Sequence, residues 1–358
     1  ATAPARLRGA MPGGGLACHR LRAMIPSGET MILHCRGRAA SELGLAVRAT
    51  RPAARVIFDC RGWEGPELLH AHGFDSAERA PPDLRERCSE AEARQRRAAR
   101  AADAVIVVSD AMRRIAVRQW GVEEARLSVV PCCAETQAPA AGTREATRAR
   151  LNFDGRLVVV YCGSLARYQA IEATLDAFDP IRRVRCDAFF FGVTPSPETL
   201  TARLRERGLR ECDSLVVSAT HTEVPALLAA GDLALLLRER SPVNEVASPV
   251  KFAEYLAAGL PVVLSEGIGD YSALVRREGL GCLLPPPPPP STSNDRLRLF
   301  LEEYDHSADA MRARCRAVAE RQLSAGRAAD TLADLYRALW RDLTGAEPGA
   351  APAQRAAA

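Results

Sequence analysis

Lys251 is the only lysine in this chain of 358 residues: Lys and Arg together number 48, so the other 47 are arginines. It lies in the stretch SPVKFAEYLAAGLPVV, residues 248–263. Ser248 is typical of a helix N-cap, Pro249 is a favoured first helical residue and Gly259 is a favoured terminator, so we expect a helix between them. The ammonium group then lies in the first turn of this helix.

Two further polar residues share the helix face of Lys251. Glu254 follows by three residues and Tyr255 by four, the spacing that brings side chains together on a helix. A helix N-terminus with a lysine suits a diphosphate, and a carboxylate one turn deeper can accept hydrogen bonds from ribose hydroxyls. This arrangement fits a sugar nucleotide. The alternative is a surface Lys–Glu pair worth about 0.3–0.5 kcal/mol, and the residues alone leave both interpretations open.

The elements that must position this helix are predicted from short apolar runs. Continuous apolar runs indicate strands of parallel sheets that are covered on both faces. They occur in two series, at 30–35, 54–60, 103–109 and 126–133, and at 155–164, 186–193, 213–219, 232–238 and 261–265. Helical segments alternate with the strands, so each series predicts right-handed βαβ units and a doubly wound α/β domain.

A segment rich in Ala, Thr, Gly and Pro divides the two series. We expect a first Rossmann-like domain over residues 1–140, a linker over 141–154 and a second Rossmann-like domain over 155–324. A helix at 325–345 follows, and the Ala- and Pro-rich residues 346–358 are expected to be disordered. Ligands of such folds bind at the carboxyl ends of the strands.

The composition restricts the class of partner. The net charge is +4, and 47% hydrophobic with 26% charged residues is typical of a globular protein. Acidic residues are interspersed among the arginines, which argues against a nucleic-acid partner. The exception is RQRRAAR, residues 94–100, which is either a solvated helix face or a patch for anionic lipid headgroups.

The cysteines and the hydropathy predict a location. Eleven cysteines are scattered without a C-x-x-C, as in proteins of a reducing compartment, and no apolar run approaches the roughly 18 residues of a membrane span. We therefore expect a cytoplasmic protein, and the basic patch adds the alternative of peripheral contact with the inner face of the membrane.

SPVKFAEYLAAGLPVV resembles the donor-site signature of the retaining GT-B glycosyltransferases, the large family described by a Glu–seven residues–Glu motif. Further stretches resemble the same family, and the likeness covers roughly residues 30–343. They are DAVIVVSDAMRRIAVRQWGVEEARLSVVPCC, VVVYCGSLARYQAIEATLDAF, EVPALLAAGDLALLLRER and QLSAGRAADTLADLYRALW. The resemblance implies two Rossmann-like domains facing a cleft, with a C-terminal helix that crosses back to the first domain.

On the donor side, the resemblance assigns roles by position. Glu254 matches the second Glu of the motif, which holds the ribose, and Ser248 and Tyr255 are counted as donor-binding with it. The first Glu of the motif would fall at Val246. Either the neighbouring Glu245 or the backbone at Val246 is therefore expected to contact the sugar.

The basic pair of the family is changed in this chain. After the glycine turn at Gly163, the family often has an Arg and then a Lys–Gly, where this chain has Ser164 and then Gln–Ala at 169–170. Arg167 lies between these positions. Lys251 and Arg167 are therefore the expected ligands of the diphosphate, and Gly163, Ser164 and Gln169 are expected to line the donor site.

On the acceptor side, His34, Arg36, Asp59 and Arg61 lie at the ends of two predicted strands. The family often has a His at the place of Arg61. Asp59 and Arg61 are therefore candidates for catalysis, and His34 and Arg36 for contact with the acceptor. The alternative is that Asp59 and Arg61 only pair with each other and that His34 is structural.

The start of the first domain departs from the family. A strand, a Gly-rich loop and a helix usually come before the strand that carries His34, but only about 30 residues precede it here. Gly14, in PGGG at 12–15, is the candidate remnant of that loop. We therefore expect a shortened acceptor domain.

The resemblance implies a reaction. The chain is expected to move a sugar from a UDP- or GDP-linked donor to a saccharide or lipid-linked acceptor, with retention of configuration, in polysaccharide biosynthesis. We find no D-x-D motif, so neither a metal nor another cofactor is expected. The alternatives are a sugar-nucleotide-binding protein without activity and, with less support because no carboxylate pair is evident, an epimerase of the same fold.

Overall fold

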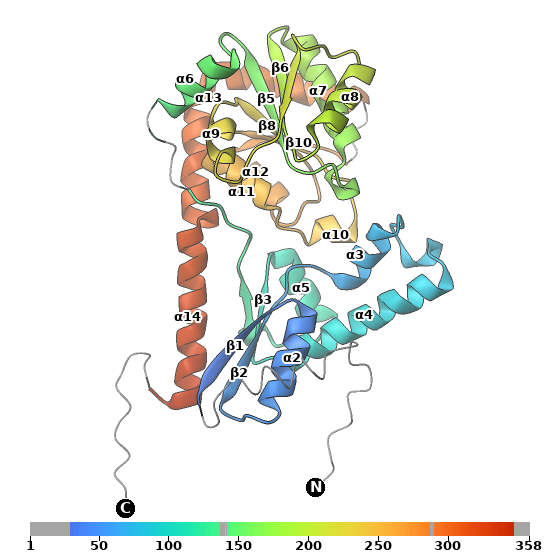
Figure 1. Cartoon of the computed structure of the whole chain (residues 1–358), viewed down its shortest axis with the longest axis vertical. Helices are drawn as coiled ribbons and strands as arrows, with labels where there is room; N and C mark the ends of the chain where they lie inside the picture. Colours follow the sequence, from blue (N-terminus) through green and yellow to red (C-terminus); the bar gives the residue numbers. More distant parts are fainter. Residues whose placement is uncertain (1–28, 137–139, 141, 287–289, 347–358) are drawn as a thin grey trace, which may run out of the picture. The chain divides into compact units, whose positions relative to one another are not determined.

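The computed structural model describes residues 29–136, 140, 142–286 and 290–346. These residues fall into two compact units. The first unit contains the residues up to 108, residues 112–130 and those from 330 on, and the second unit contains 109–111 and 131–329. Each unit has its own parallel sheet and is described by itself (Figure 1).

The first unit, over its described residues, carries a sheet of four parallel strands in the order β1-β2-β3-β4. The strands are Met31–Arg36, Ala54–Asp59, Ala104–Val107 and Leu127–Val129. The helices are α2 (Arg38–Arg48), α3 (Glu64–Ala71), α4 (Pro82–Ala101) and α5 (Asp110–Arg118), with 3-10 turns at Ala77–Arg79 and Glu124–Arg126. All four predicted strands are present. The last ends before Pro131, which has no N–H for a sheet hydrogen bond.

The second unit carries six parallel strands in the order β10-β9-β8-β5-β6-β7. In chain order from β5 to β10 they are Leu157–Cys162, Ala188–Val193, Ser214–Val217, Leu233–Leu236, Val262–Ser265 and Gly281–Leu284. From β5 the chain builds the sheet in one direction to β7 and then in the other direction from β8 to β10. The boundary between β5 and β8 is therefore a topological switch point, where open α/β sheets bind ligands.

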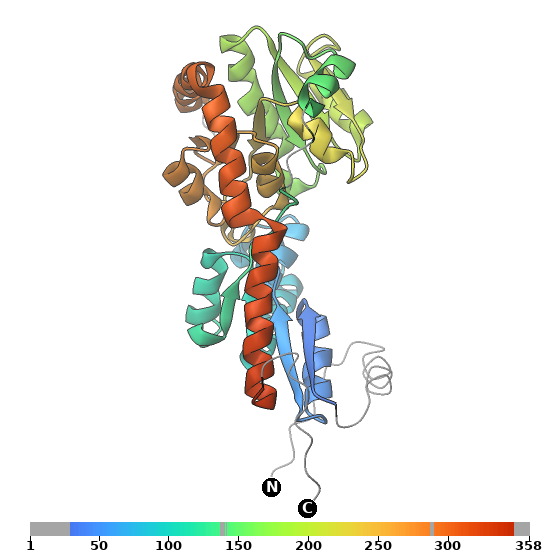
Figure 2. The same cartoon turned by 90° about the vertical axis from the view of Figure 1, so that its left-hand side faces the viewer.

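Helices cover both faces of this second sheet. They are α6 (Thr143–Leu151), α7 (Ile171–Val184), α8 (Pro197–Glu206), α9 (Val224–Ala229), α10 (Pro242–Glu245), α11 (Val250–Ala257), α12 (Tyr271–Glu278) and α13 (Pro290–Leu323), with a 3-10 turn at Arg167–Gln169. In Figure 2 the long α13 runs along this unit, and it contacts α7, α11 and β10. All six residues of β5 and of β6 are buried, as the continuous apolar runs predict.

The last helix, α14 (Ala325–Thr344), joins the two units. It begins in the second unit, and from Asp330 on its residues belong to the first. There Tyr336 hydrogen-bonds His34 of β1, and Asp342 pairs with Arg55 of β2. The predicted C-terminal helix that returns to the first domain is confirmed.

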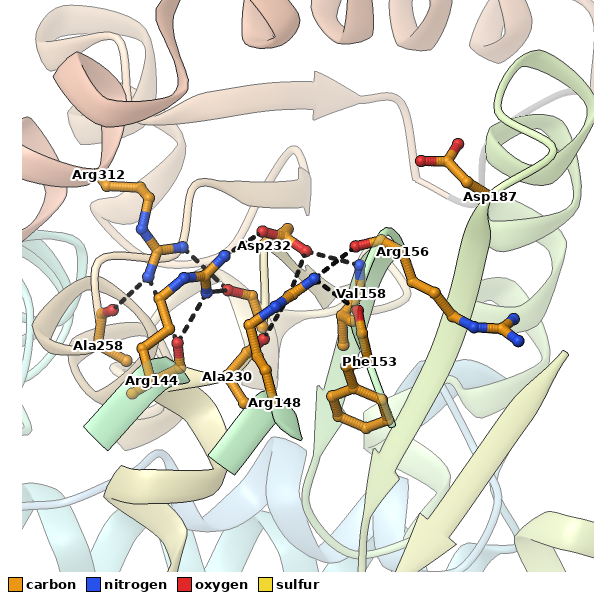
Figure 3. A network of polar contacts seen from close by, with 12 residues as sticks. Arg144, Arg148, Phe153, Arg156, Val158, Asp187, Ala230, Asp232, Ala258 and Arg312 are labelled. Atoms are coloured by element: carbon orange, nitrogen blue, oxygen red, sulfur yellow. Dashed lines mark hydrogen bonds and ion pairs between the residues drawn. The ribbon is translucent and has the colours of Figure 1, made fainter. Parts of the chain in front are cut away.

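Helix α6 corrects the prediction of a plain linker over 141–154. The sequence of this helix has no apolar periodicity from which it could be predicted, because ionic contacts hold the helix in place (Figure 3). Arg144 and Arg148 lie one turn apart and both pair with Asp232, at 2.5 and 3.0 Å. Asp232 also accepts a hydrogen bond of 2.8 Å from the backbone N–H of Val158 in β5. One carboxylate thus ties α6 to the sheet.

Arg144, Arg148 and a third arginine also donate hydrogen bonds to carbonyl oxygens at the ends of neighbouring helices. Arg144 donates to the carbonyl oxygen of Ala229 at the end of α9. Arg148 donates to the carbonyl oxygen of Ala230 (Figure 3). Arg312 of α13 donates to the carbonyl oxygens of Gly231 and Ala258, the latter at the end of α11. The last carbonyls of a helix lack intrahelical partners and carry partial negative charge, so cations stabilise them.

Two predictions fall outside the described residues. Gly14 belongs to the undescribed stretch 1–28, and residues 347–358 make up nearly all of the predicted tail. Across the residues that the structure does describe, no helix combines the length and the apolar character needed to cross a lipid bilayer.

Candidate functional site

Lys251 is buried in the second unit, with 8% of its surface exposed. Its Nζ donates a hydrogen bond of 2.8 Å to Oε1 of Gln169 and lies 5.0 Å from the centre of the Tyr161 ring. It makes no ion pair with Glu254 or with any other described residue. The surface-pair interpretation is therefore wrong, because the ammonium group lies inside the unit and its hydrogen-bond partner is a neutral amide.

Gly163 leaves the space that the ammonium group of Lys251 occupies. It follows β5 with φ at +146°, and a Cβ built on it would lie 1.9 Å from Nζ of Lys251. No side chain fits in that space, and the φ is one that L residues rarely adopt. The glycine turn predicted from the sequence thus has a physical reason: the backbone leaves room for the ammonium group.

Gln169 and Ala170 complete this turn. Gln169 is 5% exposed and accepts the hydrogen bond from Lys251. Ala170 has φ 44° and ψ 55°, the left-handed conformation that favours glycine. The family's Lys–Gly is therefore replaced by an amide that binds the lysine of α11 and by an alanine that keeps the glycine backbone.

Two of the expected donor-binding residues have structural partners instead. Ser248 is not the N-cap: α11 begins at Val250 after Pro249, without a side-chain cap. The Ser248 hydroxyl instead accepts from the N–H of Cys132 at 2.9 Å and lies 2.7 Å from the Tyr271 hydroxyl. The reason is its burial, at 7% exposed, which directs it to interior groups.

Tyr255 also differs from the expectation. It is completely buried, and its hydroxyl accepts a hydrogen bond of 2.8 Å from the N–H of Cys162 at the end of β5. The side chain thus binds the strand that leads into the glycine turn. Its role is to position Gly163, and it has no surface left for a donor.

Glu254 is half-buried on α11 and has no hydrogen-bond partner for its carboxylate among the described residues. Burial raises the pKa of this carboxyl, and the charges of His221 and Lys251 oppose that rise. A half-buried carboxylate with unused acceptor positions can receive hydrogen bonds from a diol.

Glu245 and Val246 lie just before α11. Glu245 ends α10, is exposed and pairs with Arg240 at 3.2 Å. Val246 is 4% exposed, and its carbonyl oxygen accepts a hydrogen bond of 2.8 Å from the Ser109 hydroxyl. The structure thus leaves Glu245 accessible and engages the Val246 carbonyl within the second unit.

Ser164 and Arg167 lie in the turn after β5. The carbonyl oxygen of Ser164 accepts a hydrogen bond of 2.6 Å from the Tyr161 hydroxyl, which fixes the turn. Arg167 is exposed in the 3-10 turn that ends at Gln169. The structure therefore brings Gly163, Ser164, Gln169 and Lys251 together and leaves Arg167 on the surface.

Arg238 is a further buried cation, which no sequence motif predicted; it follows β8 and is 7% exposed. Its Nη1 donates to Oδ1 of Asn244 at 3.1 Å, and its guanidinium lies 5.3 Å from the centre of the Tyr168 ring. The signal was in the sequence: an arginine interrupts a continuous apolar run at the carboxyl end of a strand, as "LALLLR" ends at 238.

The two buried cations act on each other. The pKa of Lys251 is lowered to about 7, mainly by burial, and the positive charge of Arg238 contributes to this lowering. Burial also lowers the pKa of Arg238. Both groups therefore favour the arrival of a negative charge, which compensates the lost hydration of the cations.

A second polar cluster lies in the first unit. Asp59, at the end of β2 and 2% exposed, lies 2.9 Å from Nε of Arg61 and 3.4 Å from Nε2 of His34. Nδ1 of His34 lies 2.6 Å from the Tyr336 hydroxyl of α14. Arg36 is exposed at the end of β1, beside Asp59 in the strand register.

This cluster keeps Asp59 ionised. Burial would raise the pKa of Asp59, but the hydrogen bond with His34 and the charge of Arg61 outweigh burial and lower it. The predicted pairing of Asp59 with Arg61 is present, and His34 extends it to the last helix. The cluster both anchors α14 and holds a histidine, an arginine and a carboxylate at the carboxyl ends of β1 and β2.

The basic run 94–100 lies on α4. Arg94 binds both carboxylate oxygens of Glu42 in α2, at 2.6 and 3.0 Å, and Gln95 is buried and bonded to the backbone of Gly62. Only Arg96, Arg97 and Arg100 of the run are exposed. Part of the patch therefore holds α4 to α2, and contact with lipid stays a prediction.

Both halves of the chain match models of glycosyltransferase families. Residues 2–133 match the model described as "Glycosyl transferase 4-like domain", and residues 143–321 match "Glycosyl transferases group 1". A curated relative, alpha-D-kanosaminyltransferase of Streptomyces kanamyceticus, is 25% identical over 279 residues, which are 76% of this chain and 70% of that protein.

Solved structures share the fold. HepE of Anabaena in complex with UDP matches with a TM-score of 0.67 at 15% identity, over 91% of this chain and 82% of that chain. A trehalose 6-phosphate synthase from Burkholderia multivorans matches with a TM-score of 0.64 at 14% identity, over 92% and 74%. The predicted architecture of two parallel-sheet α/β domains of GT-B type is confirmed.

Proposed function

The chain belongs to the glycosyl transferases group 1 family, and from this premise we propose that it transfers a hexose from a nucleotide donor to a hydroxyl group with retention of configuration. The observation that carries the proposal is Lys251, an ammonium group buried against Gly163 with Glu254 one turn further along α11. A diphosphate beside the lysine and a ribose at the carboxylate account for both side chains.

Each donor residue has a proposed task. Lys251 binds the diphosphate and stabilises the charge that develops on it as the sugar leaves. Glu254 accepts hydrogen bonds from the ribose hydroxyls. Gly163, Ser164 and Gln169 form the turn that holds the phosphate against the lysine, and Glu245 or the backbone near Val246 contacts the sugar. Arg167, exposed in the same turn, approaches the phosphate when the donor binds.

The proposed chemistry needs no protein nucleophile. The acceptor oxygen forms a bond to the anomeric carbon on the face from which the phosphate leaves, as the bond from that carbon to the phosphate oxygen breaks. The departing phosphate takes the acceptor proton. The protein contributes positioning and charge stabilisation. We also propose that buried side-chain cations carry this stabilisation without a metal, and that activity persists in EDTA.

The donor and acceptor classes belong to the proposal as well. HepE, a neighbour in fold, was solved with UDP and with UDP-glucose. UDP-linked hexoses are therefore the first donors to test, with GDP-linked ones next, and a saccharide or lipid-linked hydroxyl is the proposed acceptor. In the first unit, we assign His34, Arg36, Asp59 and Arg61 to the acceptor side and the exposed arginines of α4 to anionic lipid.

The test compares Lys251→Ala and Glu254→Ala. Loss of the lysine should lower kcat/KM by about 10²–10³, because one charge-stabilising donor is removed, and should leave nucleoside binding unchanged. Loss of the carboxylate should weaken nucleoside and nucleotide alike. Arg276→Ala, which removes an exposed arginine that pairs with Glu266, is the matched control for a lost positive charge. Wild-type turnover and diphosphate binding by Lys251→Ala would contradict the proposal.

A second candidate is a binding protein without transfer activity. The observation that favours it is the absence of basic side chains at Ser164 and Gln169, where the family often has them. A single-turnover assay with radiolabelled UDP-glucose and an acceptor panel separates the two. Binding without transfer or hydrolysis favours the second candidate, and NMR of the anomeric proton in any product decides retention.

A further inference from the structure

Arg238 has no task in the proposed function above. We propose that Arg238 is a second ligand of the donor diphosphate and that, with Lys251, it replaces the basic pair that this chain lacks at Ser164 and Gln169. The inference rests on the proposed function, because it adds a residue to the same donor site. It stands on position, burial, an unused donor group and the neutral partners of both cations.

The position of Arg238 follows from the sheet. β8 lies next to β5, with Val160 opposite Ala234 in the register. Both strands run parallel, so their carboxyl ends meet at one edge. The glycine turn at Gly163 follows β5 there, and Arg238 follows β8. This is the topological switch point of the sheet, where the ligands of open α/β folds bind.

The guanidinium of Arg238 is buried without a carboxylate. Its residue is 7% exposed, and no ion pair with it is present among the described residues. Its Nε is buried and has no hydrogen-bond partner within the part of the chain that the structure describes. Buried charged groups are normally paired, and a buried N–H normally has an acceptor. The missing partner is an acceptor with negative charge.

Lys251 shows the same deficit. Its ammonium group donates to the neutral Oε1 of Gln169, and the guanidinium of Arg238 donates to the neutral Oδ1 of Asn244. Each of these two buried cations, whose charges repel each other, thus has a neutral hydrogen-bond partner of its own. A diphosphate supplies several acceptor oxygens and compensates both charges, and the planar fork of an arginine fits phosphate oxygens.

Asn244 and Tyr168 hold the guanidinium in orientation. Asn244 is completely buried, and its Nδ2 donates to the carbonyl oxygen of Glu239 at 2.8 Å, which fixes the amide with Oδ1 toward Arg238. The ring of Tyr168 lies against the guanidinium on the side of the 3-10 turn. Nη1 is held by these contacts, and Nε remains for the ligand.

The experiment measures ligand affinities by calorimetry. The probes are UDP and GDP, each beside its nucleoside, and inorganic pyrophosphate as a probe without a base. Arg238→Met should weaken the nucleoside diphosphate that the parent binds, and pyrophosphate, by about 10–100-fold, the range of a hydrogen bond to a charged group. The nucleoside should bind as tightly as to the parent.

Arg312→Met is the matched control. Arg312 is also 7% exposed in the same unit, but its guanidinium binds carbonyl oxygens at helix ends. This variant should melt at a lower temperature and keep the parent ratio of diphosphate to nucleoside affinity. Arg238→Met, in contrast, should melt at or above the temperature of the ligand-free parent, because it removes a buried charge without a partner.

The outcomes separate this inference from the proposed function. If the parent binds none of the probes, both fail together. If the parent binds and Arg238→Met binds UDP or GDP equally well, only the role of Arg238 is wrong. Equal weakening of nucleoside and diphosphate would assign Arg238 to structure and overturn the inference. Should Arg238→Met not fold, Arg238→Lys serves: we expect weaker diphosphate binding with unchanged nucleoside binding, and parent affinity for both would overturn the role.

Discussion

Arg312 and Arg238 are equally buried in the second unit, yet they meet different partners. Arg312 donates to the carbonyl oxygens of Gly231 and Ala258, where the ends of helices favour a cation. Its neighbours Arg144 and Arg148 also have Asp232. Arg238 has a neutral amide and an unbonded Nε, and Lys251 beside it has another neutral amide.

This difference separates structural cations from candidate functional ones. Burial alone does not distinguish the two kinds of cation in this chain with 47 arginines, since the guanidinium groups of Arg312 and Arg238 are both buried. What distinguishes them is whether their buried N–H groups have hydrogen-bond acceptors within the protein. A cation whose N–H groups all have acceptors stabilises the fold, whereas a cation that lacks an acceptor is a candidate for binding a ligand that supplies one.

The largest effect is expected for Asp232→Ala. This change removes the one carboxylate that binds both Arg144 and Arg148 and leaves two partly buried cations without it. We expect the free energy of unfolding to fall by about 3–5 kcal/mol, measured by urea denaturation. Donor affinity below the transition should not change. Glu266→Ala, which breaks an exposed pair with Arg276, is the control and should cost less than about 1 kcal/mol.

The second prediction concerns pH. The ammonium form of Lys251 is the form that binds phosphate, and in the free protein burial lowers the pKa of Lys251 to about 7. Affinity for UDP-glucose should therefore be highest below pH 7 and fall by up to about tenfold per pH unit above it. Uridine affinity should stay constant. The slope is measured by calorimetry between pH 6 and pH 9, chosen values that bracket the pKa.

Two variants sharpen the pH test. Lys251→Arg should remove the slope, because a guanidinium keeps its proton over this range. Arg238→Met should move the fall in affinity to higher pH, because the charge of Arg238 contributes to the lowered pKa of Lys251. A slope that persists in Lys251→Arg would show that another group titrates.

The third prediction concerns the stability of the ligand-free protein. The pKa of Lys251 is lowered from 10.5 to about 7 on folding. Below pH 7 the folded state holds a buried cation, and between pH 7 and 10.5 the unfolded chain binds more protons, so this penalty shrinks as pH rises. Lys251→Met should therefore stabilise the protein by about 1–3 kcal/mol at pH 6 and progressively less toward pH 10. A variant less stable than the parent at every pH would place Lys251 with the structural cations.

The smallest effect is expected at Ala170. Its left-handed backbone costs an alanine about 1–2 kcal/mol, whereas glycine adopts it freely but has more entropy to lose on folding. Ala170→Gly should raise the free energy of unfolding by up to about 1 kcal/mol and leave donor affinity unchanged. Asn152→Gly, at the other described non-glycine residue with positive φ, is the matched comparison.

The sequence predicted the elements better than the contacts. Apolar runs located all four strands of the first sheet and β5 to β9 of the second, because a strand covered on both faces must be apolar throughout. They missed β10 at the edge of the second sheet, a strand of four residues of which only alternate ones are buried. Helix α6 was missed because Arg144 and Arg148 hold it through charges from distant residues, and such contacts leave no local period. Lys251 was found because it is a single lysine within a motif. Its burial and its amide partner required the fold.

The candidate site shows the same limit. Ser248 has the residue type and place of a cap, yet it bonds to Cys132 and Tyr271 because interior donors compete for it. Tyr255 shares the helix face predicted for ligand contact, but its own side chain is completely buried and its hydroxyl bonds to the N–H of Cys162. Arg238 was overlooked because one arginine among many carries no signal by its type. Only its place after β8, together with its unbonded Nε, sets it apart.

The single lysine also has a consequence for chemical labelling. Because the chain has one lysine, reagents that acylate or alkylate side-chain amines have one ε-amine to find. With its pKa near 7, that amine is largely uncharged and nucleophilic at pH 8, unlike an ordinary surface lysine. Peptide mapping after such a reaction measures the extent of modification at Lys251 alone. A ligand that shields this interior position from the reagent would therefore be detected as a lower extent of modification.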